Sequence, residues 1–392
     1  MGNKNYAYIN NEMLKWARSK TPFSSVEKVE AQRSNIKAKM LSNWEKGLKL
    51  PTINQAKELA SLYKVPLACF YLSEHPKNEP KPYVDRRTNR GTLYARESYE
   101  LWAEIKRITD NRSLMIEHVG RDFTFPSVPI YDHRLSLDEL ACLIREFLGI
   151  APPYNRKTSY KGKSFKFFRD IFEKRGIMVS QLTCVSLEEA KGLSIYYDVF
   201  PVIAVNSKDF ERAKVFSLFH ELAHILRRSS SLCLIDFDER SDVEEKQCDR
   251  IAAEILMPEP QFREVSKKYY DNYLNWSTEC LQDIGVKFAV SSTSVARRLY
   301  ELKIITQFEF QSIYNRLVTE FEKEKLSLEE RKKNEELKIP YFSRYLNREG
   351  YLFPKTIISA YYEGRISYGE VCQKLNVNTK HISKIERAVM SK

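Results

Sequence analysis

The sequence predicts an α+β fold that is mostly helical, and three observations lead to this. Apolar residues recur at helical spacing in short bursts over the first 72 positions, which leaves almost no room for strands. Three apolar runs with short polar breaks, at 177–182, 193–197 and 202–205, predict the strands of one small sheet. After Pro260 the helical spacing returns. We therefore expect an N-terminal helical bundle, a central unit with a small sheet, and a helical C-terminal region.

Composition narrows the class of protein. A chain of 392 residues with 43% apolar and 30% charged residues predicts about two to four packed units. Its seven cysteines form no CxxC pair, and no apolar signal segment opens the sequence, so we expect a reducing cytoplasm. No apolar run approaches the roughly 18 residues of a membrane helix, which excludes a membrane span. The net charge of +12 favours polyanion partners, although basic charge also promotes solubility.

The elements follow in order along the chain. The N-terminal bundle ends near Leu72, and a charged connector with three prolines follows at 73–90. Amphipathic spacing predicts helices at 94–116 and 135–148. A further helix runs from 164 to Arg175-Gly176, directly before the three strands.

The second half of the chain continues this pattern. A helix at 210–227, a polar loop to Val243 and a helix at 244–256 complete the central unit. The charged run at 321–338 is typical of a solvated helix or a linker. A helix-turn-helix rhythm returns at 339–392, where a packing unit is favoured over a second DNA-binding element. The expected division of the chain is 1–75, 76–160, 161–265, 266–338 and 339–392.

The helix at 210–227 contains the sequence His220-Glu221-Leu222-Ala223-His224. Residues four apart lie on one face of a helix, so the two imidazoles converge on one point. Glu221 projects beside them, where it can act as a base on a metal-bound water. Zinc is the expected cofactor, and two histidines merely packed on a helix are the alternative.

A catalytic zinc site needs a third protein ligand. Glu245 and Asp249 lie four apart on the next helix, so Glu245 can bind the metal while Asp249 accepts the other ring N–H of a zinc histidine. An exposed acidic helix face is the alternative. Rival ligands are Glu244, Cys233, Asp236 and Asp238.

Two longer stretches carry a family resemblance. AKVFSLFHELAHIL followed by EEKQCDRIAAEILMP resembles the ImmA/IrrE family of metallopeptidases, as do VDRR, PVIAVN and the AYYEGRISYGEVCQKLNV tail. NEMLKWARSK and NWEKGLKLPTINQAKELASLYKVPLACFYL resemble the Xre-type helix-turn-helix domain that many members carry at the N-terminus. The resemblance implies a zincin-like central unit with an HExxH helix, of the gluzincin-like type.

The resemblance also implies a function. It predicts a cytoplasmic regulator whose zinc endopeptidase cleaves a partner protein, such as a transcriptional repressor or the product of a neighbouring gene. Carried over by position, His220, His224 and Glu245 bind zinc, and Glu221 is the catalytic base. Cys248 replaces the alanine that usually precedes the Asn or Asp of the second motif. The alternative function is a non-catalytic, antitoxin-like regulator that binds DNA or protein and whose metal site is idle or structural.

The N-terminal domain has its own candidate surface. If 36–46 is its recognition helix, the residues that face DNA are Lys37, Lys39, Met40, Ser42 and Asn43. Lys46 and Lys49 lie where they can meet phosphate. Glu30 stands where similar domains usually place alanine, and Glu27 adds a second carboxylate. DNA contact, protein binding and dimerisation therefore all stay open for this domain.

Overall fold

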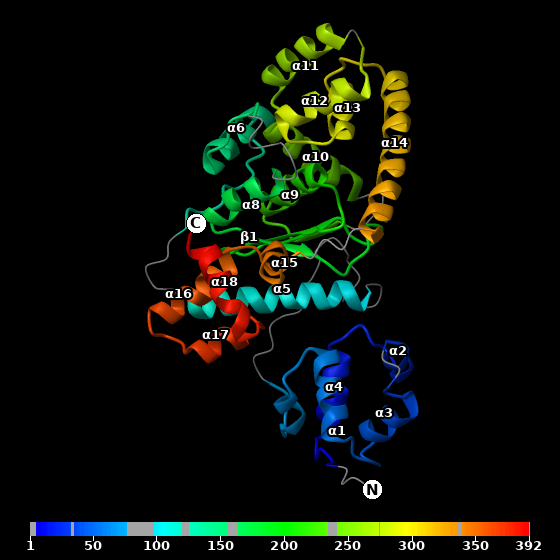
Figure 1. Ribbon diagram of the computed structural model, residues 1–392, viewed down its shortest axis with the longest axis vertical. Coiled ribbons are helices and arrows are strands. Elements are labelled where there is room, and N and C mark those ends of the chain that lie inside the picture. Colours follow the sequence, from blue (N-terminus) through cyan, green and yellow to red (C-terminus); the bar gives the residue numbers. More distant parts are fainter. Residues whose placement is uncertain are drawn as a thin grey trace. The chain divides into compact units, whose positions relative to one another are not determined.

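The computed structural model describes residues 5–32, 35–76, 98–119, 125–154, 164–233, 241–273, 275–334 and 339–391. Two compact units span 1–109 and 110–392, and the division falls within helix α5 (Tyr99–His118). Figure 1 shows the labelled elements. In these described ranges no helix is long and apolar enough to cross a membrane.

The first unit is a bundle of short helices. Its elements are α1 (Asn11–Ser19), α2 (Val26–Gln32), α3 (Ala38–Glu45), α4 (Ile53–Tyr63) and the 3-10 helix η1 (Leu67–Tyr71). Arg18 on α1 makes two hydrogen bonds to Glu45 on α3, of 2.7 and 2.9 Å, and these bonds raise the pKa of the Arg18 guanidinium. Such a bidentate, largely buried pair fixes the position of α3 against α1.

The second unit contains a four-stranded sheet. Its strands are β1 (Met178–Leu182), β2 (Gly192–Ile195), β3 (Val202–Asn206) and β4 (Ser231–Cys233), in the order β1-β3-β2-β4. β1 runs parallel to β3, whereas β2 is antiparallel to both β3 and β4. Every residue of the first three strands is buried, which explains why each appears in the sequence as an apolar run without alternation.

The prediction of a polar loop up to Val243 was wrong at its start. Residues 231–233 form β4 on the edge of the sheet, next to β2. Three residues are too few to show the alternation that identifies a strand, and the pairing comes from β2, far away in the sequence. Helix α10 (Ser241–Leu256) also begins three residues before the predicted start.

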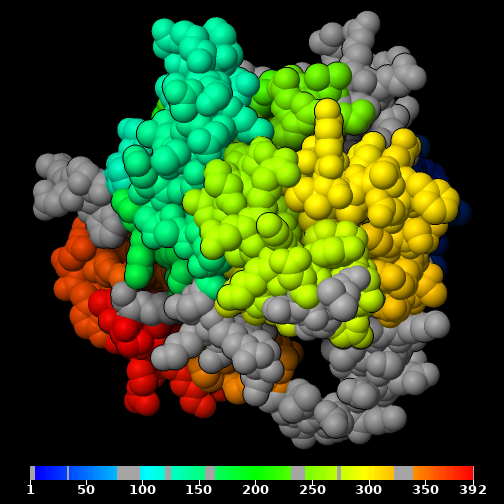
Figure 2. Space-filling model, turned by 90° about the horizontal axis from the view of Figure 1, so that it is seen from above, coloured from blue at the N-terminus to red at the C-terminus, as the bar shows by residue number. Residues whose placement is uncertain are grey.

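Helices make up most of the rest of this unit. They are α6 (Leu137–Leu148), α8 (Ser164–Lys174), α9 (Glu211–Leu226), α10, α11 (Glu259–Tyr273), α12 (Thr278–Phe288), α13 (Ser292–Glu301) and α14 (Gln307–Asn334). α8 and α9 cover one face of the sheet (Figure 1). Figure 2 shows the far end of this unit, where α6 and α11 are neighbours at the surface and α14 lies on the opposite side of α11 from α6. The predicted charged run is helical up to Asn334, and 335–338 lie outside the described residues.

Four C-terminal helices complete the second unit: α15 (Tyr341–Glu349), α16 (Leu352–Tyr362), α17 (Tyr368–Lys374) and α18 (Thr379–Met390). α15 lies on the opposite side of the sheet from α9 (Figure 1). Both oxygens of Glu173 on α8 accept from the backbone N–H of Tyr351, at 3.0 Å. Gly350 has φ +77°, and a Cβ atom there would collide with Oε1 of Glu173. Only glycine therefore fits this junction without strain.

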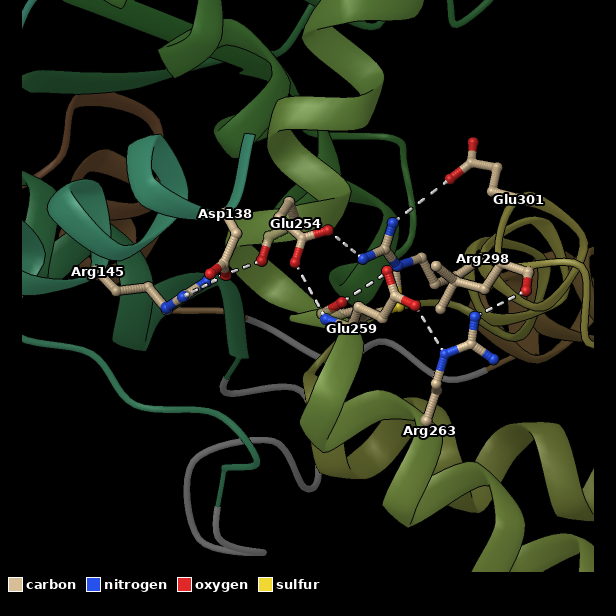
Figure 3. Close-up of polar contacts among 9 residues, drawn as sticks. Asp138, Arg145, Glu254, Glu259, Arg263, Arg298 and Glu301 are labelled. Atoms are coloured by element: carbon tan, nitrogen blue, oxygen red, sulfur yellow. Dashed lines mark hydrogen bonds and ion pairs between the residues drawn. The ribbon is translucent and has the colours of Figure 1, made fainter. Parts of the chain in front are cut away.

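A buried ion pair joins α10 to α13. Glu254 and Arg298 contact each other while their side chains are 6% and 4% exposed (Figure 3). Glu254 Oε1 also accepts from the backbone N–H of Glu259, at 3.0 Å, and Arg298 Nε donates to the carbonyl of Met257, at 3.1 Å. These bonds satisfy the groups around the turn between α10 and α11, so the pair fixes the C-terminal end of α10.

This arrangement predicts a large loss of stability for Glu254→Gln. The substitution keeps the shape but leaves the buried Arg298 charge with only its longer contact to Glu301, of 3.9 Å, so the free energy of unfolding should fall by about 3 kcal/mol. Glu259→Gln is the matched control, because Glu259 pairs with Arg263 at 47% exposure and should cost less than about 1 kcal/mol. Urea unfolding followed by circular dichroism measures both, and equal midpoints would contradict the assignment.

Candidate metal centre

Helix α9 is held from two sides. It packs on the sheet through β2 and β3 and against α10 (Figure 1). Leu218, Leu222 and Ala223 are fully buried within the same core as Ile251 and Ala252 of α10. With α9 and α10 packed along each other, the polar residues of both helices meet at one place.

The three predicted ligands lie together at this place. Nε2 of His220 is 2.9 Å from Oε2 of Glu245 and 3.2 Å from Nε2 of His224. Nε2 of His224 is 3.6 Å from Oε1 of Glu245. Each residue therefore offers one ligand atom to a common point.

These distances fit a small tetrahedral metal ion. Bonds of about 2.0–2.1 Å from nitrogen and oxygen to zinc place neighbouring ligand atoms about 3.3 Å apart. The three measured separations, 2.9, 3.2 and 3.6 Å, bracket that value. His224 is 1% exposed, whereas the side chains of His220 and Glu245 are 12% and 27% exposed, so the centre is closed on one side and accessible on the other.

Two adjacent residues of α10 orient the two imidazoles. Oδ1 of Asp249 is 2.9 Å from Nδ1 of His220, and Sγ of Cys248 is 3.5 Å from Nδ1 of His224. In a metal-binding tautomer each Nδ1–H donates to these atoms, which fixes the ring and raises its basicity as a ligand. The sequence suggested the contact of Asp249. It marked Cys248 only as a replacement for alanine, without a partner.

Arg297 is a further residue that the sequence did not reveal. Its Nη1 lies 3.1 Å from Oδ2 of Asp249, so a chain of contacts runs from α13 through Asp249 to His220. Burial raises the pKa of Glu301, one turn further along α13, while Arg297 and Arg298 oppose this rise. No local pattern links positions 249 and 297, so only the packing of α13 brings them together.

Glu221 lies against the sheet. It is 1% exposed, and a Cβ atom built on Gly192 of β2 would lie 2.8 Å from its Oε1 and 3.2 Å from its Cγ. Gly192 therefore provides the space for this carboxylate. The sequence did not identify Gly192, because an isolated glycine in a strand can equally mark a bulge or a tight bend.

The rival ligands are placed as follows. Glu244 is directed to Arg227, 3.6 Å away, and its side chain is 49% exposed. Cys233 belongs to β4, and Asp236 and Asp238 lie outside the described residues. Glu245 is thus the described acid of α10 that joins the two histidines.

The predicted DNA contacts lie on or directly before α3 in the first unit: Lys37, Lys39, Met40, Ser42 and Asn43. Lys39 is exposed, whereas Met40 packs against the core of the bundle. Lys37 is already paired with Glu30, at 3.2 Å. DNA binding by these residues stays a prediction.

Alanine substitutions should distinguish Glu245, a predicted zinc ligand, from the adjacent Glu244. Glu245→Ala and His220→Ala should each remove most of the zinc bound by the purified protein, because two remaining ligands hold the ion weakly. Glu244→Ala should leave the zinc content unchanged. Atomic absorption after dialysis against a weak chelator measures this, and equal loss from both glutamate variants would refute the ligand set.

The contacts of Asp249 predict that its own substitution lowers zinc affinity more than substitution of Arg297 does. Asp249→Ala should lower zinc affinity about 10- to 100-fold, because His220 loses the group that orients its ring. Arg297→Gln should lower affinity less, since Asp249 itself remains. Competition with a chromophoric chelator gives both affinities. A stronger effect of the arginine variant would show that the chain of contacts does not act through Asp249.

Comparison with known proteins fits this geometry. Residues 172–300 match the Peptidase M78 family model, which describes the IrrE N-terminal-like domain. The matched segment contains α9, α10 and nearly all of α13, and with them the three candidate ligands, Glu221, Asp249 and Arg297. No curated protein matches the chain. The segment 172–300 is therefore similar to a metallopeptidase-type domain.

Proposed function

We propose that this protein is a zinc-dependent endopeptidase and a cytoplasmic regulator that acts by cleaving a specific partner protein. The observation that carries the proposal is the position of Glu221, next to a histidine of the ligand triad and held against β2. A purely structural zinc site is closed by four protein ligands and needs no base beside it. Here three ligands and a separate carboxylate are present.

In the proposed reaction, the zinc ion and the protein residues have separate roles. Zinc, when bound, supplies a Lewis acid for a carbonyl oxygen and lowers the pKa of a coordinated water towards about 7. Glu221 takes the proton of the attacking water on a carboxylate oxygen and passes it to the leaving amine. His220, His224 and Glu245 hold the metal, and Asp249 keeps the His220 ring in one orientation.

The rest of the chain supports a regulatory role. A digestive peptidase has no need of the additional helical unit, which resembles an Xre-type domain, as its sequence indicates. In this proposal the partner is a protein such as a transcriptional repressor or a neighbouring-gene product, and the first unit selects the partner or its site. A non-catalytic regulator is the competing function, and the catalytic base distinguishes the two.

Glu221→Gln tests the proposal directly. Because Glu221 moves a proton and does not hold the metal, the variant should keep its zinc and its fold but lose about 10²- to 10⁴-fold in cleavage rate. Glu244→Gln is the matched control, since that glutamate lies on the neighbouring helix and faces Arg227. It should retain full activity.

The assay compares new protein N-termini in cells that express wild type, Glu221→Gln or Glu244→Gln. Fragments that depend on Glu221 identify the partner, and incubation of that purified partner with and without a chelator then gives the rate. If the biological output persists in the Glu221→Gln strain while its zinc content is normal, proteolysis is not what this protein contributes.

A further inference from the structure

We propose that α17 and α18 form a second helix-turn-helix, which binds duplex DNA through the basic outer face of α18. This inference goes beyond the peptidase, does not depend on it, and departs from the sequence-based preference for a packing unit at 339–392. It rests on the packing of three C-terminal helices, on the distribution of charge around α18, and on a contrast with α3.

The framework is a compact three-helix unit. α16 packs against both α17 and α18, and the buried residues of the unit include Ile366, Val371, Leu375, Ile382 and Ile385. Four residues separate α17 from α18, which is a typical turn length for a helix-turn-helix.

The turn itself is well defined. Asn376 adopts φ +51°, and Asn378 caps α18 by accepting from the backbone N–H of Lys380, at 3.2 Å. Asparagine is among the residues that adopt a left-handed conformation most readily and is a preferred N-cap. The backbone of the turn between the two helices is therefore set by its own residues.

The charges of α18 are gathered on one side. At about 100° per residue, Lys380, Lys384 and Arg387 fall within an arc of about 60°, opposite the buried Ile382, Ile385 and Val389. Ser383 lies within the same exposed face. The face thus combines cations with a hydroxyl group, as surfaces that contact phosphates and base edges do.

These cations are not neutralised within the described part of the chain. No ion pair there engages Lys380, Lys384 or Arg387. Glu386, the single acid of α18, contacts Tyr362 at the edge of the face. In Figure 2 the red atoms of this C-terminal segment lie on the outside of the molecule. The face is therefore accessible and carries an uncompensated positive charge.

Helix α3 differs from α18 because an acidic side chain lies at its start. Oε2 of Glu30 accepts from the backbone N–H of Ala38 at the start of α3, at 2.8 Å, and its Oε1 pairs with Lys37. These contacts lower the pKa of Glu30, and the carboxylate, paired with Lys37, already occupies a backbone N–H at the start of α3 where a phosphate would bind. The cap of α18 is the neutral Asn378. Of the two helix-turn-helix elements, α18 is thus the one that suits a polyanion.

The dimensions agree with a recognition helix. Such helices place their N-terminal residues on base edges in the major groove. Thr379, Lys380 and Ser383 occupy this part of α18, while Lys384 and Arg387 follow along the same side. Lys380 and Arg387 are seven residues apart, or about 10 Å, which spans neighbouring phosphates of the duplex.

Three double variants of the full-length protein, each lacking two lysine charges, test the proposal. They are Lys380→Ala with Lys384→Ala on α18, Lys37→Ala with Lys39→Ala at α3, and Lys267→Ala with Lys268→Ala on the exposed side of α11. Alanine favours helix, so the folds should persist, as circular dichroism will show. Fluorescence anisotropy measures binding to labelled mixed-sequence duplex DNA and to one of its single strands, over a range of salt concentrations.

We expect the wild type to prefer the duplex and the α18 variant alone to lose about tenfold or more in affinity. Its slope of log K against log salt should decrease by about 2, one unit for each lost phosphate contact. Three outcomes would overturn the proposal: no salt-sensitive binding by the wild type, equal losses in all three variants, or a loss confined to the α3 variant. Equal binding to single strands would also contradict a major-groove helix.

Discussion

The packing of α9 against α10 is the constraint on which the candidate site depends. α9 supplies two ring nitrogens and the Glu221 carboxylate, but rings on a helix surface rotate unless something holds them. α10 supplies Glu245. It also places Asp249 beside Nδ1 of His220 and Cys248 beside Nδ1 of His224. The Glu254–Arg298 pair then fixes the C-terminal end of α10. Helix α10 thus supplies the third ligand and the groups that orient the two imidazoles, while α13 holds its C-terminal end.

Local spacing explains why the centre of the site could be predicted from the sequence. His220 and His224 are four residues apart, as are Glu245 and Asp249. Each pair therefore lies on one face of its segment once that segment is helical. Gly192 and Arg297 could not be predicted, because they approach the centre from β2 and α13 through tertiary packing. The same reason applies to β4, which exists only through its pairing with β2.

Much of the fold was also predictable from the sequence. Strands buried on both faces appear as apolar runs, and amphipathic helices show their period of 3.6. The ends of the elements were harder to predict, as the early start of α10 shows. The two segments with predicted helix-turn-helix spacing show a similar limit, because apolar spacing predicts both alike. Only the folded structure reveals that Glu30 occupies the start of α3, whereas the outer face of α18 keeps its charges.

The short separation of the ligands in the chain has a consequence for folding. His220 and Glu245 are only 25 positions apart, so bringing them together closes a short loop and costs little chain entropy. The contact of α9 with α10 therefore needs less loop closure than that of β1 with α15, which lie far apart in the chain. A metal ion bound between α9 and α10 would add its binding free energy to the stability of this short-range contact.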